Sequence, residues 1–367
     1  MNDDLRFMKP FLPPIEEYEH YLKEIWESEQ LTNNGKLVQR LEDELQDYLG
    51  VKNIALFSNG HMSLEAILRA CEVKGEVITT PLTFVSTTHA IINCGAIPVF
   101  ADIKRDDLTI DPNKIEECIT EKTTAILPVH AYGNICDQRA IDDIARRHNL
   151  KVIYDAAHAF GINRGKNNIY EFGDASAISF HATKCFHTVE GGAVIVNDDR
   201  LLQQIKASRN FGLDGLESKW VSGNMKMSEF HAAMGLCNLK YADGLRYKRK
   251  QMTEMYMELL QSVSSIELMY DKNTDFEVYS YFYVIFKGGM AVRDKVFEYL
   301  KEKGYLSRKY FYPVLTEMSS IQGRFKNNDV PIAKSVSESI LCLPLYSGLE
   351  HRDISKICVL IKDILGE

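Results

Sequence analysis

The chain has 367 residues, of which 45% are hydrophobic and 26% charged, and its formal net charge is −8 at pH 7. This length suits one large domain with a smaller one, and the composition is that of an ordinary soluble globular protein. The acidic balance excludes the basic footprint of a nucleic-acid-binding protein, and no run approaches the ~18 consecutive apolar residues of a membrane span. We therefore expect neither nucleic acid nor a membrane as a partner.

The cysteines and the N-terminus both indicate a cytoplasmic location. Eight cysteines are spread along the chain without a Cys-x-x-Cys pair or a Cys/His cluster of zinc-site spacing. Such cysteines are typical of reduced core thiols in a cytoplasmic protein. The first six residues, Met-Asn-Asp-Asp-Leu-Arg, lack the basic start and apolar run of a signal peptide. We expect a cytoplasmic protein without a metal site.

Short apolar runs alternate with helical patterns between about residues 50 and 200. The apolar runs are predicted strands, at residues 53–57, 76–80, 97–101, 124–128, 152–155, 175–180 and 193–197. Between two of them a helical face is formed by Ile141, Ile144, Ala145 and His148, and Asp137 can cap that helix. Strands that are apolar throughout and separated by helices indicate an α/β domain with a mostly parallel sheet.

The two ends of the chain have different patterns. Before residue 50, one face of an N-terminal helix is formed by Leu37, Leu41, Leu45 and Leu49. After about residue 240 the predicted elements are helices at 241–264, 292–303 and 353–365 and strands near 266–270 and 279–286. We therefore divide the chain into a large domain, residues 1–240, which includes the N-terminal helix, and a small C-terminal α+β domain, residues 241–367.

Lys184 is the most informative residue of the sequence. It follows the predicted strand 175–180 and precedes the pair Gly191-Gly192, while Asp155 ends another predicted strand about 30 residues earlier. A strand ending in aspartate, followed by a strand leading to serine and lysine, is typical of a pyridoxal phosphate pocket. In such a pocket the lysine holds the cofactor as a Schiff base and the aspartate holds the ring nitrogen.

The proposed task of Asp155 is energetically reasonable. Raising the pKa of a pyridine nitrogen by two units needs ~2.7 kcal/mol. A carboxylate at ~3 Å, with an effective dielectric constant of ~20, offers about 5.5 kcal/mol before desolvation losses. The alternative interpretation is an aspartate that caps a turn, but the following Ala156-Ala157 pair leaves clearance for a flat ring.

Other residues are placed where a cofactor needs them. Gly60 and His61 begin a helix after the strand 53–57, so their amides can bind a phosphate, and Ser179 can add a hydroxyl. Phe84 follows the strand 76–80 and would lie at the carboxyl edge of the sheet, where it can cover the ring or simply begin a helix against the core. His158 can hydrogen-bond the ring oxygen or serve as a core histidine.

These motifs together resemble the sugar-nucleotide aminotransferases of the DegT/StrS group, which are pyridoxal phosphate enzymes of fold type I. The resemblance covers nearly the whole chain, and the motifs occur in the family's order: Leu31-Thr-Asn-Asn-Gly35, Ser58-Asn59-Gly60, Pro81-Leu-Thr-Phe84, Pro128-Val-His130-Ala-Tyr132-Gly133, Asp155-Ala-Ala-His158, Ser179 to Lys184, Glu190-Gly191-Gly192 and Gly223-Asn224-Met-Lys-Met227-Ser228. The resemblance implies an aspartate-aminotransferase-like α/β fold with a large domain around a mostly parallel sheet and a smaller α+β domain.

The resemblance also implies roles for individual residues. Lys184 would form the Schiff base with pyridoxal 5′-phosphate, Asp155 would bind the pyridine nitrogen, and His158 would contact the ring hydroxyl. The remaining cofactor contacts would be the stacking ring of Phe84 and the phosphate ligands Gly60, His61 and Ser179. Asn224 would reach the phosphate of the neighbouring subunit, so a homodimer with shared active sites is expected.

Two positions distinguish this chain within the resemblance. The family usually has threonine where this chain has His61; the backbone amide survives this change, but a hydroxyl contact is lost. Related enzymes that remove a sugar hydroxyl carry histidine at the position of Lys184. The lysine therefore favours transamination.

The resemblance implies the substrate-binding residues less directly than the cofactor-binding ones. His181, two residues before Thr183, can approach the sugar or serve as an ordinary histidine at the end of a strand, and the segment with Arg308, Tyr310 and Tyr312 lies where the family places sugar and diphosphate contacts. Arg308 suits bidentate recognition of a phosphate.

The reaction that the resemblance implies is the transfer of an amino group from L-glutamate to carbon 4 of dTDP-4-oxo-6-deoxyglucose, giving a dTDP-4-amino-4,6-dideoxy sugar. Alternatives are amination at carbon 3 of a 3-oxo sugar nucleotide and a non-catalytic, ligand-sensing regulatory protein on the same fold. A nicotinamide dehydrogenase is disfavoured because no Gly-x-Gly-x-x-Gly follows a predicted strand.

Overall fold

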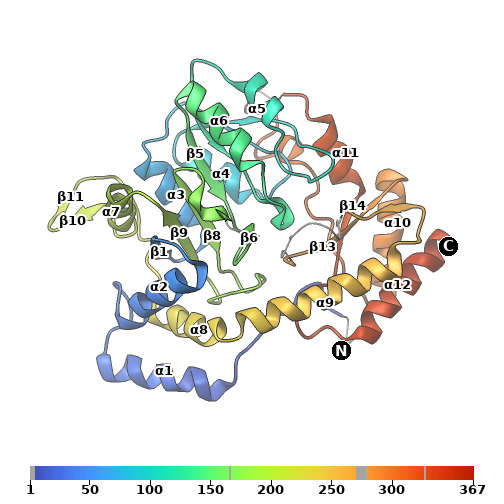
Figure 1. The fold of residues 1–367 in the computed structure, drawn as a ribbon, viewed down its shortest axis with the longest axis horizontal. Helices are drawn as coiled ribbons and strands as arrows, with labels where there is room; N and C mark the ends of the chain where they lie inside the picture. The colour runs from blue at the N-terminus through green and yellow to red at the C-terminus, as the bar shows by residue number, and fades with distance from the viewer. Residues whose placement is uncertain (1–4, 165–166, 270–278, 326–327) are drawn as a thin grey trace.

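The computed structural model describes residues 5–164, 167–269, 279–325 and 328–367. Its centre is a seven-stranded sheet with the order β1-β9-β8-β5-β4-β2-β3, in which β9 runs antiparallel to β1 and β8 and the other neighbours pair in parallel (Figure 1). The strands are β1 (Asn53–Phe57), β2 (Glu76–Thr79), β3 (Ile97–Phe100), β4 (Thr123–Leu127), β5 (Lys151–Asp155), β8 (Ala175–Ser179) and β9 (Gly192–Val196). All seven predicted strands are confirmed, as is the mostly parallel sheet.

Helices cover both faces of this sheet, which explains why its strands are apolar throughout. Along β1, Ile54 and Leu56 pack into the core formed with α2 and α8, whereas Ala55 and Phe57 pack into the core formed with α3 and α7. Successive side chains of a strand point to opposite faces, so each face buries its own set. The covering helices are α2 (Lys36–Leu49), α3 (Gly60–Ala70), α7 (Asp199–Ser208) and α8 (Glu229–Leu239).

Two predicted helices are confirmed with their details. The leucine face of α2 is buried along its whole length. Helix α6 begins after Asp137, whose carboxylate accepts a hydrogen bond of 3.2 Å from the Ala140 amide, as a capping residue does. The other elements of this part are α1 (Ile15–Ser28), α4 (Ser86–Asn93), α5 (Pro112–Cys118), α6 (Gln138–His148), the 3-10 helices η1 (Ala131–Gly133) and η2 (Ile169–Glu171), and the short strands β6 (Asn163–Arg164), β7 (Asn167–Asn168), β10 (Leu213–Asp214) and β11 (Glu217–Ser218).

A smaller antiparallel sheet, of order β12-β13-β14, lies in the C-terminal part. The strands predicted near 266–270 and 279–286 correspond to β12 and β13, which are shorter; residue 270 lies outside the described residues. Strand β14 and helix α11 were not predicted. The elements are α9 (Ala242–Leu260), β12 (Ile266–Glu267), β13 (Phe282–Phe286), α10 (Gly289–Glu302), η3 (Leu315–Glu317), α11 (Pro331–Ser339), β14 (Ile340–Leu343) and α12 (His351–Leu365). The division near residue 240 stays a prediction.

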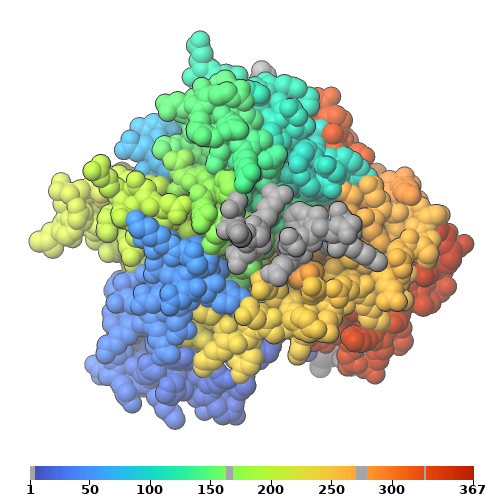
Figure 2. All heavy atoms as spheres, in the orientation of Figure 1, coloured from blue at the N-terminus to red at the C-terminus, as the bar shows by residue number. Residues whose placement is uncertain are grey.

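The two parts of the chain are joined at several places. Helix α9 extends from α8 toward α12, and in the space-filling view it lies between the N-terminal helices and the C-terminal residues (Figures 1 and 2). On the other side, the buried carboxylate of Asp102, just after β3, accepts hydrogen bonds from the amides of Ile332 (2.9 Å) and Ala333 (2.8 Å) in α11. A carboxylate is favourable at a helix N-terminus, so this contact fixes α11 against the edge of the large sheet. In the described residues, no helix is long and apolar enough to cross a membrane.

The direction of the strands determines where a site can form. Strands β1, β2, β4, β5 and β8 all end at the same edge of the large sheet, and β9 begins there. The residues that follow these strands therefore meet at one edge, although they are far apart in the sequence. In open α/β sheets ligands bind at this carboxyl edge.

Candidate active site

A cavity of about 720 Å³ lies at the carboxyl edge of the large sheet. Ten of the twelve residues that the sequence singled out line it: Gly60, His61, Phe84, Asp155, His158, Ser179, His181, Lys184, Arg308 and Tyr310. The lining thus combines segments after β1, β2, β5 and β8 with the segment before α11. The structure brings the predicted cofactor and substrate residues into one place.

Lys184 contributes the reactive amine of the cavity. It lies in the loop after β8, where its amide donates to the His181 carbonyl at 2.8 Å, and its Nζ lies 3.4 Å from the Tyr281 hydroxyl. Burial lowers the pKa of Lys184 to about 8, although the charge of Asp155 opposes this shift. Part of the lysine is therefore a neutral amine near neutral pH, as a nucleophile or base requires.

Asp155 ends β5 and presents a fixed carboxylate to the cavity. Its Oδ2 accepts a hydrogen bond of 2.8 Å from the Thr87 hydroxyl in α4, and its Oδ1 accepts one of 3.0 Å from the Ala157 amide. Burial raises the pKa of Asp155, whereas both hydrogen bonds and the Lys184 charge work in the opposite direction. A buried carboxylate that accepts only these two hydrogen bonds from the described residues is well suited to a cationic partner, such as a protonated ring nitrogen.

The turn between β1 and α3 is a candidate anion site. Asn59 caps α3 by accepting the Met62 amide on its side chain (2.9 Å) and the Ser63 amide on its carbonyl (3.2 Å). The two amides in front of these, on Gly60 and His61, belong to the first turn of the helix and have no acceptor within it. Both residues line the cavity together with Ser179, so amides and a hydroxyl face the same space.

Two glycines allow this close arrangement. A Cβ on Gly60 would lie 2.9 Å from the Ser179 Cβ, so Gly60 must be glycine for the serine to approach the turn. A Cβ on Gly192, at the start of β9, would lie 2.6 Å from the Asn59 carbonyl carbon and 2.7 Å from the Gly60 nitrogen. Gly192 therefore lets β9 pack directly against the Asn59–Gly60 turn, a role that the sequence pattern alone did not reveal.

We expect Gly192→Ala to weaken cofactor binding by at least about tenfold, because the added methyl group displaces the backbone that carries the phosphate-binding amides. The clash is with backbone and cannot be relieved by a side-chain rotation. Titration of the apoprotein with pyridoxal phosphate, followed by absorbance, measures the effect. The matched control is Gly244→Ala in α9, where a Cβ meets nothing within 4 Å; equal affinities of the two variants would contradict the assigned role of Gly192.

The side chain of His61 contacts Glu65 in its own helix, α3, and Ser86 in the neighbouring helix α4. Its Nδ1 lies 2.9 Å from the Ser86 hydroxyl and its Nε2 lies 3.1 Å from Glu65 Oε1. Burial raises the pKa of Glu65, but hydrogen bonds from His61, Asn93 and Arg69 outweigh it and lower this pKa to about 2. His61 therefore ties α3 to α4, and only its backbone is available to a phosphate. The histidine that replaces the family's usual threonine is thus accommodated by contacts with these two helices.

The imidazole of His158 is neutral and can donate a hydrogen bond. Its Nδ1 accepts a hydrogen bond of 3.2 Å from the Tyr132 amide, so the proton of the neutral ring is on Nε2. Burial, together with the Lys184 charge, lowers the pKa of His158 well below its ordinary value. The ring also stacks on Phe311 at 5.9 Å with an interplanar angle of 7°. A neutral Nε2–H suits a contact with an ionised ring oxygen.

Phe84 lies at the mouth of the cavity. Half of its surface is exposed (50%), which is unusual for a phenylalanine. It is 6.4 Å from the Tyr310 ring, measured between ring centroids. An exposed aromatic ring on a cavity wall is available for stacking on a flat ligand.

Of the four residues predicted to contact the substrate, three line the cavity and one does not. His181 bonds the Thr183 hydroxyl at 2.8 Å and lies 3.6 Å from Glu190, at the cavity wall. Arg308 lies exposed at the wall, with its guanidinium 5.5 Å from the ring centroid of Tyr310. Tyr312 lies elsewhere, with its ring 4.5 Å from the guanidinium carbon of Arg293. It does not line this cavity in the described residues.

Asn224 lies outside the cavity of its own chain. It is exposed and pairs through its backbone with Asn210. The next residue, Met225, accepts a hydrogen bond of 2.8 Å from the Ser58 amide, so this segment runs beside the turn that carries the anion site. An exposed position suits a contact with a second subunit, which stays a prediction.

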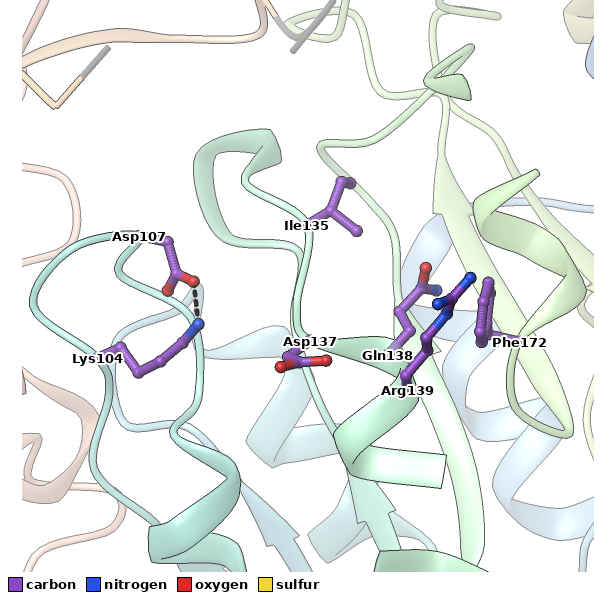
Figure 3. A pocket seen from close by; sticks show the side chains of 7 residues that line it. All are labelled: Lys104, Asp107, Ile135, Asp137, Gln138, Arg139 and Phe172. Carbon is purple, nitrogen blue, oxygen red and sulfur yellow. Dashed lines mark ion pairs between the residues drawn. The ribbon is translucent and has the colours of Figure 1, made fainter. Parts of the chain in front are cut away.

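A second cavity, of about 410 Å³, does not offer the same chemistry (Figure 3). Its lysine, Lys104, forms an ion pair with Asp107, drawn as a dashed line in Figure 3. Burial works against the charge of Lys104, but the pairing with Asp107 keeps its pKa above that of an ordinary lysine. This amine stays protonated and engaged at neutral pH, so the cavity beside Lys184 is the candidate active site.

The residues of the first cavity fit pyridoxal phosphate. Amides and a hydroxyl are available for the phosphate, a buried carboxylate for the ring nitrogen, a neutral Nε2–H for the ring oxygen and an amine of lowered pKa for the aldehyde. In the described residues, no group of three or more His, Cys, Asp or Glu is arranged to hold a metal ion.

Comparison with known proteins assigns the chain to a family. It is 41% identical over 358 residues to a protein of Shigella dysenteriae named dTDP-4-amino-4,6-dideoxy-D-glucose transaminase, covering 97% of this chain and 98% of that protein. The structure of DesI, solved in the presence of its TDP-sugar product, has a TM-score of 0.94 at 30% identity and covers 100% of this chain and 94% of that chain. NtdA from Bacillus subtilis, solved with bound cofactor PMP, has a TM-score of 0.88 at 25% identity and covers 100% of this chain and 87% of that chain. Residues 14–362 match the DegT/DnrJ/EryC1/StrS aminotransferase family, and the chain belongs to that family.

Proposed function

We propose that the protein uses pyridoxal phosphate to transfer an amino group from L-glutamate to carbon 4 of dTDP-4-oxo-6-deoxyglucose. The observation that carries this proposal is the buried Lys184 amine, with its lowered pKa, in the same cavity as the hydrogen-bonded Asp155 carboxylate. The choice of substrate is supported by the name of the Shigella dysenteriae relative, which is 41% identical. The product is then a dTDP-4-amino-4,6-dideoxy sugar.

Each of these residues has a defined task in this proposal, and Lys184 has two. Pyridoxal phosphate supplies an electron-withdrawing ring that stabilises negative charge beside the transferred nitrogen. Gly60, His61 and Ser179 hold its phosphate, while Asp155 keeps the ring nitrogen protonated. Lys184 binds the aldehyde carbon and, once released as a neutral amine, moves the proton between the two carbons that exchange nitrogen.

The remaining residues orient the ring and the substrate. His158 donates to the ring oxygen, and Phe84 covers the ring face. Arg308, which lines the cavity together with Tyr310 and His181, faces the sugar nucleotide, since a guanidinium suits a diphosphate. Tyr312 would approach the substrate only after a rearrangement of its segment, because its ring now packs on Arg293.

We further propose a cytoplasmic homodimer with active sites shared between subunits. In this arrangement the exposed Asn224 of each chain contacts the cofactor phosphate of its neighbour. The exposure of Asn224 supports this, because an exposed side chain is available to a second subunit.

The substrate assignment can be tested by product analysis. The protein is incubated with pyridoxal phosphate, L-glutamate and either dTDP-4-oxo-6-deoxyglucose or the 3-oxo isomer, and the amino sugar is identified by NMR. Amination of the 4-oxo sugar is the expected result. Preferential amination at carbon 3 would replace the proposed substrate by the alternative, and failure of glutamate to convert the bound cofactor to its aminated form would indicate a non-catalytic sensor.

The lowered pKa of Lys184 predicts how the cofactor is taken up. Only the neutral amine attacks an aldehyde, so the rate of Schiff-base formation by apoprotein should fall about tenfold per pH unit below a midpoint near 8 and level off above it. Stopped-flow absorbance measures this rate. Binding of 4-deoxypyridoxine phosphate, which lacks the aldehyde, is the control and should not follow the same curve. A midpoint close to that of an ordinary lysine, about 10.4, would contradict the assignment.

A further inference from the structure

Tyr281 contacts the amine of Lys184. Its hydroxyl is the partner of Lys184 Nζ at 3.4 Å, and Nζ lies 5.8 Å from the centroid of its ring. The side chain is almost fully buried (4% exposed), and it is not among the described residues that line the cavity. Tyr281 is thus positioned to touch the amine without touching a ligand in the cavity.

The same ring also supports His158. The two rings meet edge to face, with centroids 4.9 Å apart and an interplanar angle of 72°. On its other side Tyr281 stacks on Phe7 at 6.5 Å. One side chain therefore packs against two residues that are proposed to bind the cofactor.

The backbone just before Tyr281 is bonded both to the large-sheet part of the chain and to helix α9. The Ser280 hydroxyl donates to the His158 carbonyl at 2.7 Å, and the Arg249 guanidinium donates to the carbonyls of Tyr279 and Ser280, both at 3.3 Å. The thiol of Cys185, next to the lysine, donates to the Tyr279 carbonyl at 3.8 Å. These bonds hold the segment before β13 beside Lys184, which places the Tyr281 hydroxyl near Nζ.

A phenol suits both protonation states of the lysine. Burial raises the pKa of Tyr281 well above its ordinary value, so the hydroxyl keeps its proton. It can accept a hydrogen bond from an ammonium group and donate one to a neutral amine. The bond from the ammonium group is the stronger of the two because it is charge-assisted.

We propose that Tyr281 is a positioning residue that holds Lys184 Nζ whenever the lysine is not bonded to the cofactor. It keeps the free amine close to the reacting carbons during the proton transfers, and this part rests on the proposed aminotransferase function. The contact itself is a property of the apoprotein and does not depend on the substrate.

The first test is made on the apoprotein, without substrate or cofactor. Trace labelling with acetic anhydride across a pH series, followed by peptide mass spectrometry, gives the midpoint for the reactivity of Lys184. Tyr281→Phe keeps the packing ring and removes the hydroxyl, and we expect it to lower this midpoint by about half a pH unit or more, because the charged form loses its stronger bond. A midpoint that is unchanged or raised overturns the proposal.

The matched control is Tyr283, which lies in β13, two residues after Tyr281. Tyr283 is equally buried, but its hydroxyl accepts from the Asn134 side chain at 3.0 Å. Tyr283→Phe therefore removes a buried hydroxyl of β13 elsewhere and should leave the labelling midpoint of Lys184 at the wild-type value. An equal shift in both variants would show that the effect is structural and would also overturn the proposal.

The second test uses the holoenzyme with its two substrates. We expect Tyr281→Phe to lower kcat by about tenfold while KM for each substrate stays within about twofold, because only the free amine is misplaced. An unchanged kcat overturns the role in proton transfer. If the wild-type protein aminates no keto sugar nucleotide, the proposed function fails, and the labelling midpoints still decide whether Tyr281 holds the lysine.

Discussion

Replacement of Lys184 by alanine is expected to reduce amination of the sugar nucleotide by roughly 10³-fold or more and to abolish the Schiff-base absorbance of bound cofactor. The reason is that a single amine is proposed both to hold the cofactor and to move the proton, so two contributions are lost together. Steady-state assays with glutamate and the keto sugar measure the first effect, and the absorbance spectrum measures the second.

The matched control for this variant is Lys104→Ala. Lys104 also lines a cavity, but its ammonium is paired with Asp107. Its removal should leave turnover within about twofold of the wild type, as for most substitutions away from a site. Borohydride reduction of the loaded wild-type protein should attach the label to the peptide with Lys184; normal turnover of Lys184→Ala, or a label on another lysine, would refute the assigned role.

Much of the large sheet was predictable because each of its strands is marked by a pattern of neighbouring residues in the sequence. Each strand is short, apolar throughout and separated from the next by a helical pattern, so strand order along the chain could be read directly. The site followed from the same pattern, since polar residues such as Asp155 and Ser179 come at strand ends, and the carboxyl ends of parallel strands meet at one edge. The family resemblance then ordered these residues into roles.

What could not be predicted depends on contacts between distant segments. Nothing near Thr87 in the sequence indicates that its hydroxyl bonds Asp155, because the two residues belong to different elements and meet only in the folded sheet. Tyr281 contacts Lys184 across 97 positions of sequence. Strand β14 was missed because its four buried residues follow directly on α11, with no turn signal between the two elements.

His61 and Tyr312 show the limits of transferring a role by motif position alone. The backbone of His61 lies where the family's phosphate contact is expected, while its ring forms a separate network with Ser86 and Glu65. Tyr312 lies in the expected segment, yet its ring packs on Arg293 and its hydroxyl lies 3.4 Å from the Met290 sulfur. The position of a residue in a motif predicts where its backbone lies, whereas the contacts of its side chain depend on the neighbouring residues.

Asp155→Asn is expected to lower kcat by about 100-fold while the protein still binds pyridoxal phosphate. The amide has nearly the shape of the carboxylate but no charge, so it cannot hold the ring nitrogen in its protonated form; a loss of two pKa units there corresponds to ~2.7 kcal/mol. The spectrum of the bound cofactor, recorded against pH, measures the protonation, and single-turnover kinetics with glutamate measure the rate.

The stability of the same variant separates a catalytic effect from a folding effect. Because burial raises the pKa of Asp155, its ionised form is less favourable in the folded apoprotein than in the unfolded chain, and this cost is present at pH values above the folded-state pKa. The neutral asparagine avoids the cost, so the variant apoprotein should be at least as stable as the wild type at pH 8 in urea unfolding. Thr87→Val, which removes only the hydroxyl bonded to Oδ2, should give a smaller loss of kcat, about tenfold. Near-normal turnover of Asp155→Asn would refute the proposed role, whereas a large loss of stability would point to a structural aspartate.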